Sequence, residues 1–163
     1  MDYFKNIIMK NEIEYSDNMG KLKGHWKMDI FNSDDRTPEN HLQTIEGDNL
    51  ITTGGKGMIM NRLFGLSAVG AMTRIGVGTS STAAAITDTA LTSGVFVAFD
   101  STPTLSGLVV TCVATFGTAV ANISWNELAL DNGTTILNRI APIGPFAKTS
   151  AVSIIVTCTV TQN

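Results

Sequence analysis

Alternating apolar and polar positions recur along most of the chain and predict β-strands. In residues 25–31, the apolar side chains of Trp26, Met28 and Ile30 alternate with polar ones, which indicates a strand with one face toward solvent. Residues 72–78 and 94–99 form two shorter extended segments, separated by a loop at 79–91. Longer strand patterns follow in residues 106–116, 121–130, 134–142 and 151–161.

Turn-forming residues divide these strands. Pro38 lies in a polar turn over 32–40, and residues 101–104 break the chain again. Residues 41–53 are expected to be extended on either side of a turn at 46–49. Asp131-Asn132-Gly133 lies between two strand patterns and is a strong hairpin signal. We therefore expect the last sixty residues to form an antiparallel meander.

One segment, residues 54–65, predicts a helix. Thr53 is the expected N-cap and Gly65 the expected C-terminal stop. Its apolar residues form two i,i+4 pairs, Ile59 with Leu63 and Met60 with Phe64.

These elements together predict the fold class and the domain organisation. Many short strands and a single short helix indicate a mainly β protein, an antiparallel β-sandwich or jelly-roll-like domain. The domain is expected to span residues 21–163, and residues 1–20 are expected to form an N-terminal arm. The arm carries apolar side chains that we expect to bind a partner, namely Tyr3, Phe4, Ile7 and Ile8.

The distribution of charge favours assembly over catalysis. Of the 25 Asp, Glu, Lys and Arg residues, 18 precede Gly65, and the remaining 99 residues hold seven charges and 17 threonines. Threonine and valine suit a pleated, half-buried surface because their branched Cβ packs well there. A surface so poor in charge suits a protein packed against copies of itself or against other proteins.

Several partner classes are disfavoured by composition. The net charge is −3 and the lysines and arginines form no basic stripe along the chain, so we expect no nucleic-acid partner. No apolar run reaches the roughly 20 residues needed to span a bilayer, so we expect no membrane partner. The first twenty residues lack the basic and continuous apolar regions of a signal peptide, which favours synthesis in a cytoplasm.

No motif for catalysis or cofactor binding is complete. Gly76-Val77-Gly78 follows a strand, but no third glycine opens a helix after it, so nucleotide binding is disfavoured. Asp34, Asp35 and Glu39 could bind calcium in a loop, although their spacing fits an ordinary solvated turn better. The two histidines lie in separate elements, without the context of a nucleophile and its base. We expect no enzymatic activity, no cofactor and no metal.

Four polar or reactive side chains are expected to be structural. Cys112 and Cys158 each lie on the more apolar face of a strand, where we expect buried, reduced thiols. A disulfide between them requires adjacent strands in register, which the sequence does not establish. Glu127 shares a strand face with Trp125, and Arg139 across the hairpin is its natural partner in a structural ion pair.

Four segments resemble a group of small virion proteins of tailed bacteriophages. The match covers about residues 42–162 through the segments NLITTGGKGMIMNRLFG, TRIGVGTSSTAAAITDTAL, ISWNELALDNGTTILNRI and KTSAVSIIVTCTVT, in that order. Members of this group are capsid decoration (cement) proteins and tail or fibre components. The resemblance implies a structural role in a virion and carries over no catalytic residue. Residues before the match are expected to determine attachment.

Three hypotheses about function follow. The first is a capsid cement protein that binds the major capsid protein on the outer shell as a homo-oligomer, with a trimer favoured. The second is a tail, baseplate or fibre-base component of the virion. The third, from another class, is a host-surface glycan-binding module, for which two Trp and two Tyr residues offer little stacking surface.

Overall fold

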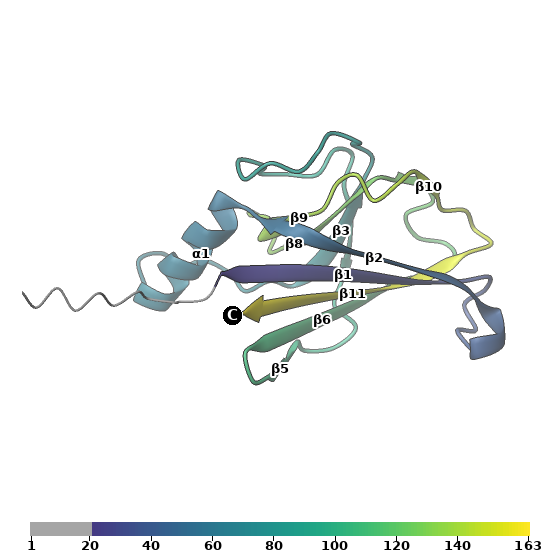
Figure 1. Cartoon of the computed structure of the whole chain (residues 1–163), viewed down its shortest axis with the longest axis horizontal. Coiled ribbons are helices and arrows are strands. Elements are labelled where there is room, and N and C mark those ends of the chain that lie inside the picture. The colour runs from purple at the N-terminus through teal and green to yellow at the C-terminus, as the bar shows by residue number, and fades with distance from the viewer. Residues whose placement is uncertain (1–20) are drawn as a thin grey trace, which may run out of the picture.

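The computed structural model describes residues 21–163 (Figure 1). The predicted arm, with Tyr3, Phe4, Ile7 and Ile8, lies outside the described residues. The elements in chain order are β1 (Leu22–Phe31), the 3-10 turn η1 (Pro38–Asn40), β2 (His41–Ile51), α1 (Thr53–Phe64), β3 (Arg74–Gly78), β4 (Val95–Ala98), β5 (Thr104–Ser106), β6 (Val109–Phe116), β7 (Ser124–Trp125), β8 (Glu127–Asp131), β9 (Asn138–Arg139), β10 (Phe146–Ala147) and β11 (Ser153–Gln162).

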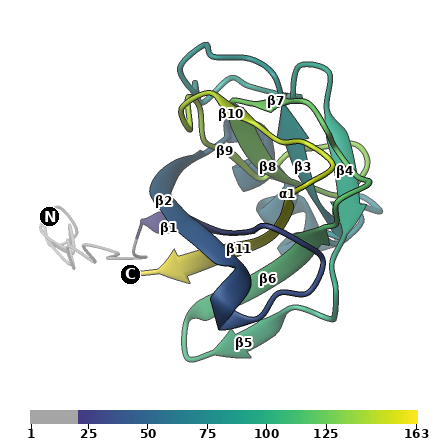
Figure 2. The same cartoon turned by 90° about the vertical axis from the view of Figure 1, so that its right-hand side faces the viewer.

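The strands form antiparallel sheets that curl around one core. The largest sheet has the order β5-β6-β11-β1-β2-β9, and a second has the order β4-β3-β8. The chain around β9 joins them, because β9 pairs with β2 while the neighbouring Ile140 bridges to Leu128 of β8. Seen nearly end-on, the sheets wrap into a half-barrel (Figure 2). The predicted mainly β, sandwich-like class is confirmed.

The core forms where the inward faces of the two sheets meet. Trp26, Met28 and Ile30 of β1 are all buried, as the alternation in this strand predicts. Opposite them, β3 and β8 contribute fully buried aliphatic side chains, including Ile75 and Leu128. Both faces of β8 are buried, and the edge that does not pair with β3 bridges to Ile140 and Ile136.

The turn predicted at residues 46–49 is wrong, because β2 continues through it. The strand pairs with β1 from Phe31 opposite His41 to Gly24 opposite Asn49. Gly47 serves packing instead of a turn, since a Cβ there would lie 2.7 Å from Cδ1 of Ile140. Pairing with a long neighbouring strand therefore outweighs the local turn preference.

The predicted helix is confirmed, but its N-cap is one residue earlier than predicted. The hydroxyl of Thr52, not Thr53, accepts a hydrogen bond of 2.9 Å from the backbone nitrogen of Gly55. Thr52 is buried and also donates to the carbonyl of Ile136 at 2.8 Å, so a tertiary contact selects the cap. Gly65 ends the helix in the left-handed conformation, as predicted.

The predicted C-terminal meander is wrong in its strand partners. β6 pairs with β11 and with β5, β11 lies between β6 and β1, and β8 pairs with β3. The hairpin at Asp131 is present, with Asp131 bridging to Ile136. Alternation identifies the faces of a strand but not its neighbour, so long-range packing decided the pairing.

Candidate functional site

Glu127 and Arg139, predicted as a pair across the hairpin, are in contact. Nε of Arg139 donates to Oε2 of Glu127 at 2.6 Å, and Glu127 has no exposed surface. The other carboxylate oxygen, Oε1, accepts from the backbone nitrogens of Thr92 at 2.7 Å and Ser80 at 3.1 Å. The buried carboxylate therefore holds both ends of the 79–94 loop.

Asp88 completes the cluster from within the same loop. Its Oδ2 accepts from Nη1 of Arg139 at 2.7 Å and from the backbone nitrogen of Ala85 at 2.8 Å. Nη2 of Arg139 donates to the carbonyl of Thr82 at 3.0 Å. Desolvation acts against the charged form of Asp88, but these hydrogen bonds outweigh it and hold its pKa below the usual value.

The ion cluster of Glu127, Arg139 and Asp88 holds the 79–94 loop against β8 and β9. Nε, Nη1 and Nη2 of Arg139 are all engaged within the described residues, and the Glu127 carboxylate is sealed from solvent. Desolvation opposes the charge of Arg139, but the bonds to Glu127 and Asp88 outweigh it and raise its pKa. Sequence reasoning missed Asp88 because 39 residues of chain separate it from Glu127. The available sequence signal for Asp88 was its place in TDTAL, residues 87–91, at the end of the second segment that resembles the virion proteins.

The lysine that opens the KTSA motif is also structural. Lys148 is buried, and its ammonium donates to the carbonyl of Gly117 at 2.8 Å and to Oδ1 of Asn122 at 2.9 Å. Burial lowers its pKa, since desolvation penalises the charge. The contact anchors the chain ahead of β11 to the loop that follows β6.

The two cysteines, whose proximity the sequence did not establish, are direct neighbours across two strands. Cys158 of β11 lies opposite Cys112 of β6 in the antiparallel register, and both are buried free thiols. Burial raises the pKa of Cys112 to about 11 and raises that of Cys158 as well. Both thiols are therefore held in the unreactive, protonated form.

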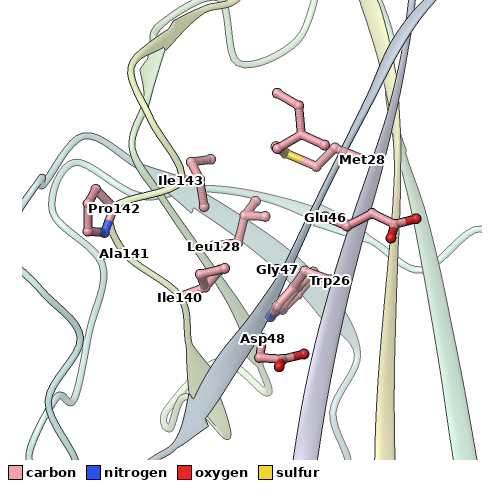
Figure 3. Close-up of a pocket in the computed structure, with 11 residues that line it drawn as sticks. Trp26, Met28, Glu46, Gly47, Asp48, Leu128, Ile140, Ala141, Pro142 and Ile143 are labelled. Atoms are coloured by element: carbon pink, nitrogen blue, oxygen red, sulfur yellow. The ribbon is translucent and has the colours of Figure 1, made fainter.

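A cavity of about 300 Å³ lies between β1, β2 and the segment 140–143 (Figure 3). Aliphatic side chains, among them Leu128 and Ile143, face Trp26 across it. The indole nitrogen of Trp26 is buried without a hydrogen-bond partner. The carboxylates of Glu46 and Asp48 lie within 3.8 Å and 2.9 Å of the His25 ring nitrogens, on the outer face of the sheet.

A larger groove, of about 870 Å³, opens between α1, the start of β1 and the end of β2. It lies at the end of the molecule that we call the α1 end, which also holds the start of β1, the end of β11 and the β5–β6 turn (Figure 1). The hydrogen bond from Gln162 to the carbonyl of Leu108 links this turn to the groove. The α1 end exposes seven large apolar side chains: Met60, Leu63, Phe64, Leu66, Ile86, Leu105 and Leu108.

The acidic turn considered for calcium is used for an internal contact. Both carboxylate oxygens of Asp34 accept from Thr118, from its backbone nitrogen at 3.0 Å and its hydroxyl at 2.6 Å. Within residues 21–163, no three His, Cys, Asp or Glu side chains gather as a metal site. In the same part of the chain, no helix has the length and apolar character to cross a membrane.

Comparisons with known proteins provide no relative for this chain. No family model, curated protein or solved structure matches it.

Proposed function

We propose that the chain is a structural protein of a tailed-bacteriophage particle, a capsid cement protein that binds the outer face of the shell. Its partner in this proposal is the major capsid protein, and it binds as a homo-oligomer, with a trimer favoured. The observation that carries the proposal is the α1 end, which exposes several large apolar side chains, among them Leu63, Leu66 and Leu108. Exposed apolar patches of this kind are typical of protein–protein contact sites.

The energetics of such a contact suit a cement protein. Full burial of one leucine or phenylalanine side chain contributes about 1.5–3 kcal/mol relative to exposure. A protein that binds the assembled shell and not its free subunits stabilises the shell by mass action. The charge-poor surface after Gly65 also favours close packing, because few charges would have to lose their hydration.

The bacteriophage part of the proposal is supported by the resemblance of residues 42–162. Four polar residues in the matching motifs, Asp88, Glu127, Arg139 and Lys148, are occupied in holding loops and strands together. Motifs whose polar residues make internal contacts favour a structural protein over an enzyme.

The decisive measurement is the copy number of this chain relative to the major capsid protein in purified particles, by quantitative mass spectrometry. A ratio near one-to-one is expected for a cement protein. A ratio of a few per cent would instead support a tail, baseplate or fibre-base position. Absence from particles would overturn the virion proposal and favour the glycan-binding module.

A reconstitution experiment tests the α1 end itself. Purified chain is added to shells that lack it, and bound protein is measured against concentration. Leu108→Asp is expected to weaken binding about tenfold or more, because it places a charge in an apolar contact. Gln43→Asp is the matched control, since this exposed residue lies on β2 toward the opposite end of the sheet. Equal affinities of the two variants would exclude the α1 end as the attachment surface.

A further inference from the structure

The groove at the α1 end has an apolar floor and a basic rim. Leu22, Leu50, Ile59, Leu63 and Ile86 contribute apolar lining from β1, β2, α1 and the 79–94 loop. Three lysines also line the groove, Lys21, Lys23 and Lys56, against one acidic residue, Asp48. A groove of this character fits a peptide segment that carries apolar side chains and acidic residues.

An unsatisfied amide lies at the same place. Both Nδ2 and Oδ1 of Asn49, which lines the groove, are buried and find no hydrogen-bond partner in the described chain. The side chain lies over Gly24, where a Cβ would come within 1.8 Å of Oδ1. A buried amide without partners retains the full cost of its desolvation. A peptide unit can pair with it, because the Asn49 amide offers N–H donors and a C=O acceptor and a peptide unit offers one of each.

We propose that this groove is the docking site of the chain's own N-terminal segment, residues 4–17. The described structure begins at Lys21, which itself lines the groove, so the segment enters at the rim. Six residues span at most about 20 Å, which brings Tyr15 within reach of the apolar floor. The segment has apolar residues at Phe4, Ile7, Ile8, Ile13 and Tyr15. Its two lysines, Lys5 and Lys10, precede the acidic part nearest the groove, which holds Glu12, Glu14 and Asp17.

The tether favours this occupant over the same segment of a second copy. A segment joined to the rim by a short linker has an effective concentration in the millimolar range, above that of a second chain in dilute solution. Docking of this kind concerns the free chain and does not depend on the proposed virion role, in which the segment would have to leave Leu63 before the α1 end binds a shell. It covers apolar side chains of the segment and of α1 at the same time.

The tyrosines provide a direct probe in the full-length protein. The chain has two tyrosines, Tyr3 and Tyr15, and both precede Lys21. Fluorotyrosine incorporated at both positions therefore reports on this segment alone in ¹⁹F NMR, and Tyr3→Phe assigns the two signals. In the unsubstituted sequence, the Tyr15 signal is expected to lie away from the position of free fluorotyrosine and to have the line width of a 17.3 kDa protein.

Two leucines of equal exposure form the matched pair of variants. Leu63 is 72% exposed and lines the groove, while Leu105 is 71% exposed and lies outside its lining. Leu63→Asp is expected to abolish the displacement of the Tyr15 signal, and Leu105→Asp to leave it unchanged. Leu63→Ala provides a second, milder variant, expected to reduce the displacement. Tryptophan fluorescence verifies that each variant retains its fold.

Three results would overturn the proposal. The first is a Tyr15 signal at the free position in the unsubstituted sequence. The second is a displaced signal that Leu63→Asp leaves unchanged. The third is a displacement that disappears on dilution, which would assign the groove to the segment of a second copy.

Discussion

Replacement of Arg139 by methionine tests whether the buried ion cluster organises the fold. The substitution keeps an unbranched side-chain stem but removes the guanidinium and its charge beside Glu127, a carboxylate with no exposed surface. Removing one partner of a buried pair costs about 3–5 kcal/mol, because it leaves an uncompensated charge. We expect the lower part of this range, since two backbone N–H groups still bind Glu127. The loss is large against a total stability of about 5–15 kcal/mol.

The assay is urea unfolding at pH 7, followed by tryptophan fluorescence. Arg36→Met is the matched control, because Arg36 lies 3.7 Å from Asp34 in an exposed pair, expected to contribute less than about 1 kcal/mol. The double variant Glu127→Gln with Arg139→Met is expected to recover at least about 1 kcal/mol, since it removes the unpaired charge. If Arg139→Met destabilises no more than Arg36→Met does, the cluster does not organise the fold.

Three further predictions concern α1, the thiols and the pH dependence of stability. In α1, Gly57→Ala is expected to stabilise the protein by up to about 1 kcal/mol, because its Cβ meets open space. Gly55→Ala is expected to destabilise it, because its Cβ would lie 2.2 Å from a backbone oxygen ahead of β9, and thermal melting of both variants checks the pair. Cys112 and Cys158 are expected to react with a thiol reagent at pH 8 only as fast as the chain unfolds, and rapid labelling of either would contradict their burial. Asp88 has a lowered pKa when folded, so its contribution to stability is present above its usual value near 4 and is lost as the pH falls through the lower, folded value. Asp88→Asn should therefore flatten the fall in urea stability below pH 4, and an unchanged slope would refute this role.

Local sequence patterns predicted the elements better than their arrangement. The alternation of Trp26, Met28 and Ile30 identified the buried face of β1, because side chains of a strand point to opposite faces in turn. Gly65 marked the end of α1 for an equally local reason, because glycine readily adopts the left-handed conformation that ends a helix. Gly47 misled the prediction of β2, because the pairing with β1 runs straight through this residue, opposite Trp26.

The ion cluster was predictable in part. Glu127 and Arg139 lie on either side of a recognisable hairpin, so their pairing followed from register alone. Asp88 is brought to Arg139 by the folding of the 79–94 loop, for which no periodic pattern exists. The groove at the α1 end has the same origin, since its lining comes from five separate segments.

The sequence by itself determined where the long strands β1, β6 and β11 lie, which of their faces is apolar, and where the single α-helix of the described chain ends. These properties depend on neighbours a few positions apart, through the periods of the strand and the helix. Only the tertiary structure decided that β11 lies between β6 and β1, that Cys112 faces Cys158, and that Thr52 caps α1. Each of these three features depends on contacts between segments that are far apart in the sequence. Local patterns do not specify such contacts, because the packing of the whole core selects them.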